Sequence, residues 1–205
     1  MVVRQKFRKT PESTISFAFT DLVQNAGLID LMAARLHDGT SVKNVLTTNS
    51  NVASTTTYTA KLAGAGTIFA ATDWVGEFNK SFNIKGDILV MIPVWITNAA
   101  GADDAISATV TVLHNTDSIG TGTSTSTVVT GSVSNDNESM ISFIIEDVNF
   151  RIKIGDTVTL RIAASGTGSG SSNYYVFHDP LGRTGTLSND TSVMRMLLPV
   201  RLDFL

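Results

Sequence analysis

The side chains that could perform covalent chemistry are few and poorly grouped. The chain has three histidines, His37, His114 and His178, and its abundant serines lack the Gly-x-Ser-x-Gly turn of a nucleophile elbow. The most site-like pair is His178 followed by Asp179, which precedes a proline. Adjacent residues of a regular strand point to opposite faces, so this pair predicts no catalytic dyad, and Asp179 fits the start of a turn. We therefore expect no catalytic residue and no enzymatic activity.

Two loops are rich in the oxygen ligands that calcium takes. One contains Asp103 and Asp104, and the other is residues 135–138 (Asn-Asp-Asn-Glu). Neither has the spacing of an EF-hand, so solvated turns are the main prediction and a calcium site is the alternative. The glycine-rich segment 166–170 lacks the following helix and the Lys-Ser/Thr pair of a phosphate-binding loop. Because the chain has no cysteine, thiolate metal sites are excluded, and we expect no metal and no cofactor.

Aromatic side chains offer another kind of site, because their rings can stack on sugars. Trp74 lies near a predicted turn, where its side chain can be exposed. Tyr174 and Tyr175 are neighbours on one predicted strand, so one of the two rings must point outward. Trp95 lies in the most apolar segment of the chain and is expected in the core. Trp74, Tyr174 and Tyr175 are therefore the candidate glycan contacts.

The elements that must position these residues are strands. Apolar residues recur with a period of two, not 3.6, in residues 14–20, 57–62, 105–112 and 157–162. Residues 88–96 and 140–148 are apolar almost continuously, which predicts central strands covered on both faces. The apolar C-terminal segment 193–205 predicts one more paired strand.

Turn residues separate these segments at strand spacing, as at residues 85–87 and 154–156. The tracts 120–127 and 165–172 consist mostly of Gly, Ser and Thr and predict exposed loops, or an edge strand for the first tract. Residues 21–35 fit either a helix or two short strands. Eight to ten strands with so little helical period predict an all-β fold, an antiparallel β-sandwich that is jelly-roll-like.

Charge is distributed unevenly along the chain. Residues 1–9 carry four positive charges and no negative one, whereas the remaining 196 residues carry a net charge of −7. The 65 residues between Lys85 and Arg151 contain eight acids and no Lys or Arg. A nucleic-acid-binding body requires the opposite balance, so we expect no nucleic-acid partner.

The sequence divides into a basic N-terminal arm, residues 1–12, and a single β-sandwich domain, residues 13–205. The cations of the arm are Arg4, Lys6, Arg8 and Lys9. Like charges this crowded do not favour a strand, so we expect the arm to become ordered only against the acidic surface of a neighbouring subunit. The arm would then act as a subunit contact. A solvated tail without a role is the alternative.

Composition suggests where the protein works. Ser and Thr make up nearly a quarter of the chain and charged residues only 16%, as is typical of β-sandwiches that function outside a cell. No apolar region of a secretion signal follows the basic N-terminus, and no apolar run reaches the roughly 18 residues of a membrane helix. A protein made in host cytoplasm and assembled into a virion fits both facts. The mean hydropathy of +0.16 fits too, because subunit interfaces bury apolar side chains.

Three segments carry a resemblance to a known class of proteins. They are residues 17–22 (Phe-Ala-Phe-Thr-Asp-Leu), 84–87 (Ile-Lys-Gly-Asp) and 150–160 (Phe-Arg-Ile-Lys-Ile-Gly-Asp-Thr-Val-Thr-Leu). Their order resembles single jelly-roll virion proteins of bacterial and archaeal viruses, which include capsid, decoration and spike or fibre-head proteins. The last segment also resembles one in trimeric jelly rolls of the tumour necrosis factor type.

The resemblance implies a non-enzymatic structural subunit that associates with itself, most simply as a homotrimer, and with other virion proteins. It assigns no functional residue, and it implies no membrane insertion. The alternative function is a carbohydrate-binding β-sandwich module or adhesin head. The two are compatible, because a virion head domain can bind a glycan of the host surface.

Overall fold

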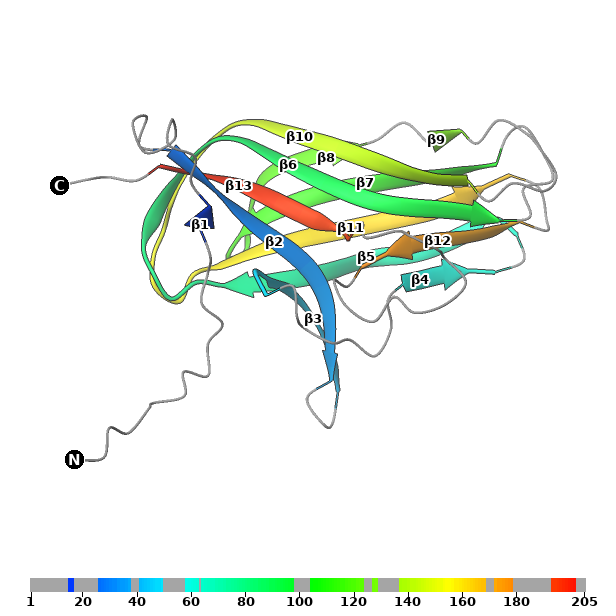
Figure 1. Ribbon diagram of the computed structural model, residues 1–205, viewed down its shortest axis with the longest axis horizontal. Helices are drawn as coiled ribbons and strands as arrows, with labels where there is room; N and C mark the ends of the chain where they lie inside the picture. Colours follow the sequence, from blue (N-terminus) through cyan, green and yellow to red (C-terminus); the bar gives the residue numbers. More distant parts are fainter. Residues whose placement is uncertain are drawn as a thin grey trace.

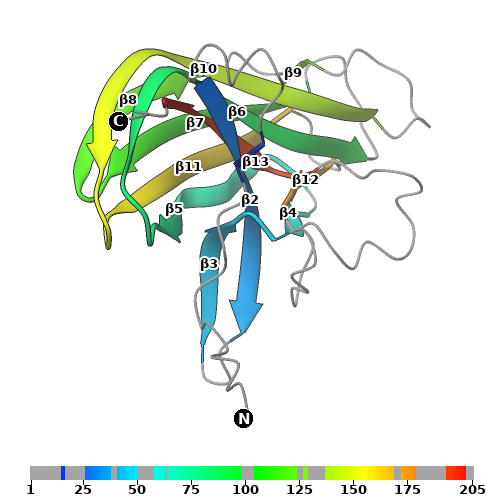
Figure 2. The same ribbon diagram turned by 60° about the vertical axis from the view of Figure 1, so that its left-hand side comes forward.

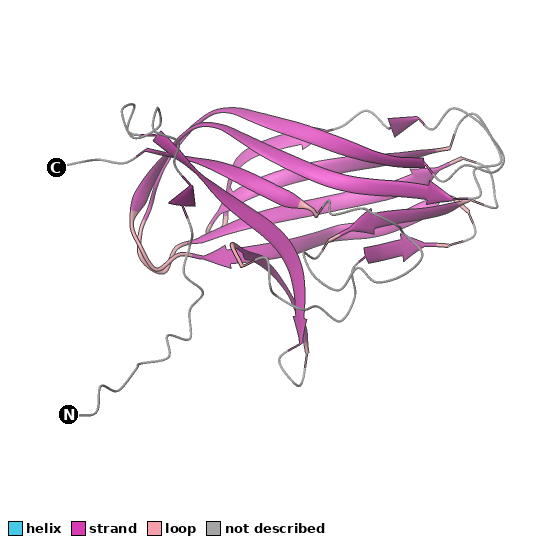
Figure 3. Ribbon diagram, in the orientation of Figure 1, coloured by secondary structure: helices cyan, strands magenta, loops and turns pink. Residues whose placement is uncertain are grey.

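The computed structural model describes residues 15–16, 26–37, 41–49, 58–62, 64–97, 104–123, 127–128, 137–168, 172–178 and 193–201. Among these residues every regular element is a β-strand, and thirteen strands are present without any helix (Figure 3). The expected all-β fold is confirmed.

Eight longer strands form two facing sheets (Figure 1). They are β2 (Ala26–His37), β5 (Gly66–Glu77), β6 (Phe82–Thr97), β7 (Ala105–His114), β8 (Asp117–Thr123), β10 (Asn137–Ile152), β11 (Thr157–Thr167) and β13 (Arg195–Arg201). The first sheet has the order β2-β13-β6-β10 and the second β5-β11-β7-β8, with every neighbour antiparallel. Counted along the chain, these are strands 1-8-3-6 and 2-7-4-5 of eight, which is the order of a jelly roll. The predicted antiparallel sandwich is confirmed.

Five shorter strands extend this framework. They are β1 (Ile15–Ser16), β3 (Val42–Thr47), β4 (Tyr58–Lys61), β9 (Thr127–Val128) and β12 (Asn173–Phe177). β12 and then β4 pair beyond the part of β6 that pairs with β13. β3 forms a hairpin with β2 that projects from the body (Figures 1 and 2), and a single parallel pair, Val45 with Val75, joins β3 to β5. The total exceeds the predicted eight to ten, and two of these short strands, β1 and β4, lie in the segments 14–20 and 57–62, where the period of two predicted a strand.

The core lies between the two sheets and takes alternate residues from each strand. β6 contributes Ile88, Val90 and Ile92, and β11 contributes Leu160 and Ile162, all without exposed surface. Each such side chain contributes roughly 1.5–3 kcal/mol by its burial, so the apolar inner layer is the main source of stability.

Residues 85–87 do not form the predicted turn. β6 runs through them as one strand of 16 residues and bends at Gly86, whose φ is +130°. The registers of β10 and β13 against β6 shift beside this bend, and Figure 1 shows β6 and β10 curling together around one end of the sandwich. The prediction was wrong because glycine supplies a positive φ to a bulge as readily as to a turn. The turn predicted at residues 154–156 is confirmed, with Gly155 at φ +87°.

Other segments also differ from expectation. Residues 26–35 lie in β2, so the helix alternative is wrong for this part of the chain. β11 continues to Thr167, so the first residues of the tract 165–172 are strand and not loop. Residues 120–123 lie in β8 at the edge of the second sheet, as the edge-strand alternative predicted.

β8 and β10 meet along one side of the sandwich through side chains. A Cβ atom on Gly120 would overlap Cγ2 of Ile145, and one on Gly122 would lie 3.0 Å from Cδ1 of Phe143. Glycine at these positions lets the inward side chains of β10 cross the backbone of β8. The two sheets can therefore approach each other closely at this edge.

Candidate functional site

The described residues do not assemble a metal-binding cluster. Among them no group of three or more His, Asp or Glu side chains is placed to hold a metal ion. His178 is fully buried, and its Nε2 lies 3.1 Å from Thr59 Oγ1. Asp179, which follows it, lies outside the described residues, as do Asp103 and residues 135–136.

Asp104 is buried, and its carboxylate holds two strands together. Ser172 Oγ donates a hydrogen bond to Asp104 Oδ2 at 2.6 Å, and the Tyr174 hydroxyl lies 3.4 Å from Oδ1. The same hydroxyl donates to the backbone carbonyl of Thr167 at 2.9 Å. Burial first, and then the Asp104 charge, raise the pKa of Tyr174, so the phenol keeps the proton that it donates. This cluster ties the end of β11 to the start of β12.

Two of the three aromatic candidates for glycan contact are core residues. Trp74 and Tyr174 have no exposed surface. Trp74 packs edge-to-face on Phe69 with 5.1 Å between ring centroids, although the two residues are five apart and would point to opposite faces of a regular strand. Ala71, with φ +86°, is a bulge between them that turns both rings inward. The expected exposure of Trp74 was therefore wrong.

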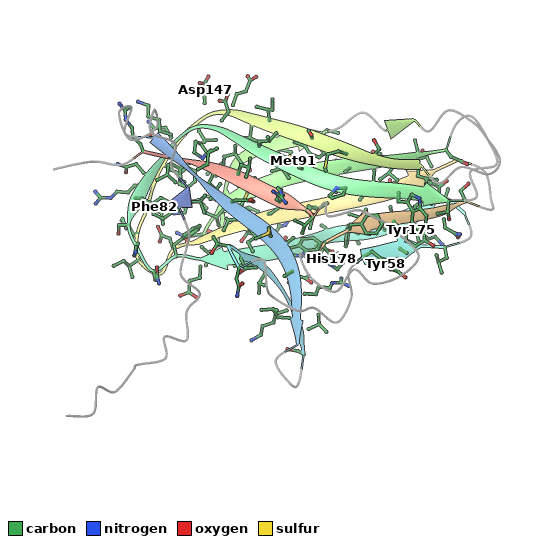
Figure 4. All side chains as sticks on the ribbon, viewed as in Figure 1. Tyr58, Phe82, Met91, Asp147, Tyr175 and His178 are labelled. Carbon is green, nitrogen blue, oxygen red and sulfur yellow. The ribbon has the colours of Figure 1, made fainter. Side chains whose placement is uncertain are left out.

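Tyr175 is the third candidate, and it does face outward, as one of the two adjacent tyrosines had to. Its ring lies 4.8 Å from Trp95 and 5.3 Å from Tyr58. Tyr58 is 44% exposed, and Figure 4 shows Tyr58 and Tyr175 together over β4 and β12. Trp95 is nearly buried, but it lies on the outer face of its sheet, beside Tyr175 on the neighbouring strand, and not between the sheets. These rings form a small aromatic cluster at one end of the first sheet.

The outer face of the second sheet is polar and built from small side chains. Ser165 lies beside Ser107, Ala163 beside Thr109, and Arg161 beside Thr111. Arg161 makes a bidentate ion pair with Asp73 of β5, at 2.7 and 2.8 Å, and that contact raises the arginine pKa. A shallow depression of about 360 Å³ on this face is lined only by Ser, Thr, Ala and Phe side chains. This face is polar enough to remain exposed to solvent.

The outer face of the first sheet is apolar, in contrast. Six outward side chains from four adjacent strands define what we call the apolar patch: Leu28, Leu89, Met91, Met140, Ile144 and Leu197. Ile144 is 61% exposed, Leu28 48% and Met140 41%, while the other three are half-buried. Exposed apolar side chains grouped on one sheet face make this face a candidate interaction surface.

One ion pair lies within the apolar patch. Arg195 Nη1 is 3.2 Å from Asp30 Oδ2, on the neighbouring strands β13 and β2. In the strand register, Asp30 lies beside Leu197, and Arg195 lies beside Met91. The patch therefore carries one acid and one base, paired with each other, and no net charge from them.

A polar network joins two turns at one end of the sandwich. Asp156 accepts a hydrogen bond from the backbone N–H of Lys153 at 2.8 Å, and its carboxylate lies 2.8 Å from His114 Nε2 and 3.2 Å from Asn115 Nδ2. These contacts, the Lys153 bond first, lower the pKa of Asp156 to about 2. Asn115 also accepts from the backbone N–H of Thr157 at 2.9 Å. The network fixes the β7–β8 turn against the β10–β11 turn.

The apolar patch was not predicted as a site, although its signal is in the sequence. Residues 88–96 and 140–148 are apolar on both faces of their strands, which led to the expectation that both faces are covered. β10 instead lies at the edge of its sheet, with Ser142 and Ile144 exposed. The available signal was that these two segments contain more apolar residues than the single inward face of each strand can place in the core.

The predicted contacts of the N-terminal arm, Arg4, Lys6, Arg8 and Lys9, lie outside the described residues. Among the residues that the structure describes, no helix has the length and apolar character needed to cross a membrane.

Comparison with known proteins gives likenesses of fold without a family. No family model matches the chain, and no curated protein matches it. One similar structure is a CocE/NonD family hydrolase from Staphylococcus aureus, with TM-score 0.44, 10% identity, and coverage of 83% of this chain and 36% of that one. Others are infectious bursal virus-derived T=1 particles (TM-score 0.28, 10% identity, coverage 80% and 39%) and the VP2 subviral particle of infectious bursal disease virus (0.24, 12%, 84% and 42%). The chain thus spans well under half the length of these proteins. At TM-scores below 0.5 these similarities assign no function.

Proposed function

We propose that this chain is a non-enzymatic structural subunit of a virion, of the kind found in bacterial or archaeal viruses. It serves as a capsid, capsid-decoration or spike or fibre-head subunit. It acts by associating with copies of itself and with neighbouring virion proteins, after assembly in the host cytoplasm.

The observation that carries the proposal is the chemical difference between the two outer faces of the jelly roll. Each outer face carries one Arg–Asp pair, but the other outward residues of the second sheet are mostly Ser, Thr and Ala with one exposed Val75, whereas those of the first sheet are mostly Leu, Met and Ile with one exposed Ser142. Burial of one such apolar side chain is worth roughly 1.5–3 kcal/mol, so leaving six of them partly in water is costly for a monomer. A subunit that is covered on one side in its assembly explains this asymmetry.

The arm supports the same proposal through its charge. Its four cations precede a body with a net charge of −7, so the arm can clamp a neighbouring subunit by electrostatic attraction. A homotrimer is the symmetry that the resemblance to jelly-roll virion proteins implies.

Mass spectrometry of purified particles from the producing cells tests the proposal. The expected result is that the chain co-purifies with intact particles through a density gradient, at a constant ratio to the other particle proteins. A cytoplasmic protein of similar size serves as the control for carry-over. Absence of the chain from intact particles would overturn the proposal.

A second function, glycan binding, is favoured by the aromatic cluster of Tyr58, Tyr175 and Trp95. The exposed Tyr58 ring packs edge-on against Tyr175, which itself lies against Trp95, and it offers an apolar face to a sugar ring. Binding on a glycan array that is lost in Tyr58→Ala and kept in the polar-face variant Thr109→Ala would support this function. No binding by the wild type to a broad array would contradict it.

A further inference from the structure

We infer that the apolar patch binds the same patch of a second copy of this chain, about a two-fold axis. The inference rests on the proposed function and names the partner of its candidate surface.

The sequences of the strands indicate that the patch becomes buried in an assembly, because its side chains are as apolar as those of the core. The inward residues of β6, such as Val90 and Ile92, are completely buried between the sheets. The outward residues Leu89 and Met91 alternate with them and are equally apolar, yet they are only half-buried (Met91 is labelled in Figure 4). Continuously apolar strands are typical of sheets that are covered on both faces. The described residues cover one face of these strands, and we assign the cover of the other face to a partner.

The size of the patch fits a whole subunit interface. It spans four strands and four successive rows of outward residues across the sheet. Leu28 lies in the first row and Met140 in the last. With strands about 4.8 Å apart and outward residues about 6.7 Å apart, the block of four strands by four outward rows that encloses the six side chains has a flat footprint of about 500 Å². Side-chain relief makes the accessible area larger, and a standard interface buries about 800 Å² on each partner. A small ligand would leave most of this area in water.

The charges favour a copy of the chain over a partner of another kind. The ion pair of Asp30 and Arg195 leaves the centre of the patch without net charge, so two patch centres do not repel each other. The exposed acids Asp87 and Glu146, two residues from Leu89 and Ile144, lie at the edge of the patch. A two-fold axis that passes between these residues places each beside the oppositely charged residue of the second copy. The same axis lies next to Leu197, the register neighbour of Asp30, and Met91, the register neighbour of Arg195, lies about 7 Å from it. An acidic or basic partner would gain nothing from this arrangement.

A contact of a patch with itself has a consequence for stoichiometry. Because it is isologous, it closes with two copies and produces assemblies with an even number of chains. The trimer of the proposed function uses a different, head-to-tail contact. A subunit that has both contacts forms a hexamer of two trimers or part of a closed shell.

Cross-linking of single-cysteine variants of the full chain tests the inference, because the native sequence has no cysteine. Leu197→Cys and Met91→Cys place a thiol near the proposed axis, and Thr109→Cys places one on the polar outer face as the matched control. A short bis-maleimide is the suitable reagent, because facing sheets pack about 10 Å apart and a direct disulfide needs Cα atoms within about 7 Å. Circular dichroism and thermal unfolding confirm that each variant is folded.

The expected result is that at least one patch variant links two identical chains in high yield, whereas Thr109→Cys remains unlinked. A thiol in a head-to-tail contact faces a different surface of the next chain and does not link to itself. The two-fold contact is wrong if both patch variants stay unlinked while the wild type still self-associates, or if all three variants link equally. In either case the proposed function would depend on a different subunit contact. If the wild type neither self-associates nor occurs in particles, the proposed function itself fails.

Discussion

At the scale of single residues, Asp156 shows how one carboxylate can organise a turn. It accepts from the Lys153 backbone and lies within hydrogen-bond distance of His114 and Asn115, which belong to another turn. All these contacts favour the ionised carboxylate, which is why its pKa falls to about 2 from an ordinary value of 3.8. The ionised form therefore links two turns at one end of the fold.

The lowered pKa predicts an acid dependence of stability with a definite sign. A carboxylate with a depressed folded-state pKa stabilises the fold fully above the unfolded value of 3.8, and this contribution is lost as the pH falls through about 2. Urea unfolding midpoints of the wild type should therefore fall more steeply between about pH 4 and about pH 2 than those of Asp156→Asn. Asp117→Asn, an exposed acid of the β7–β8 turn, is the control. Equal slopes for Asp156→Asn and the wild type would contradict this explanation.

Tyr174 provides a second prediction at this scale, because its hydroxyl is buried. Tyr174→Phe removes the donor to the Thr167 carbonyl and leaves Asp104 with one contact fewer. The expected loss is about 1–3 kcal/mol in the free energy of unfolding, measured by urea titration. Tyr175→Phe, on the outer face of the same strand, should change it by less than about 0.5 kcal/mol. Equal effects of the two substitutions would show that the buried cluster is not stabilising.

At the scale of elements, glycine determines how β8 and β10 close the sandwich. Gly120→Ala places a methyl group in the space of Ile145 and should destabilise the fold by about 1–3 kcal/mol. Thr121→Ala, the next residue of β8, is the control and should cost less than about 0.5 kcal/mol. The cost of Gly120→Ala should shrink in an Ile145→Ala background, because the clash is then removed. Additive costs in this double-mutant cycle would refute the proposed packing.

The elements also show what could be predicted from sequence and what could not. Strands with clean alternation, such as β7 and β11, were predicted because the period of two follows directly from a pleated backbone. Trp74 was misplaced because the bulge at Ala71 changes which face later residues take, and alternation does not reveal a bulge in advance. Gly86 was assigned to a turn because the residue types of a bend and a turn are the same. Prediction of the apolar patch would have required the knowledge that β10 lies at a sheet edge. That position follows from the order of the strands in the sheet and is not visible in the sequence of β10.

At the scale of the whole molecule, the proposed role depends on two separate surfaces. The apolar patch provides a contact that salt does not weaken, whereas the arm of residues 1–12 provides one that depends on charge. The two contributions can therefore be separated by ionic strength, because attraction between exposed charges is screened over about 10 Å at 0.1 M salt.

Deletion of residues 1–10 tests the contribution of the arm. The melting temperature of the isolated sandwich should stay nearly unchanged, and assembly should become weaker, with the larger loss at low salt. A variant with Arg4, Lys6, Arg8 and Lys9 replaced by Gln separates charge from length and should behave like the deletion. If the deletion unfolds the monomer, or if assembly is indifferent to it, the clamp role is wrong.

The central claim is that the apolar outer face of the first sheet is an assembly surface, and sedimentation equilibrium tests it most directly. For the wild-type chain we predict a mass that is an even multiple of the 21.8 kDa monomer. Leu197→Asp should weaken the association by about tenfold or more, which corresponds to about 1.4 kcal/mol, because it places an unpaired charge in the contact. Thr109→Asp, on the polar face, should sediment as the wild type does. A wild-type chain that remains at 21.8 kDa at every concentration and salt would contradict the account.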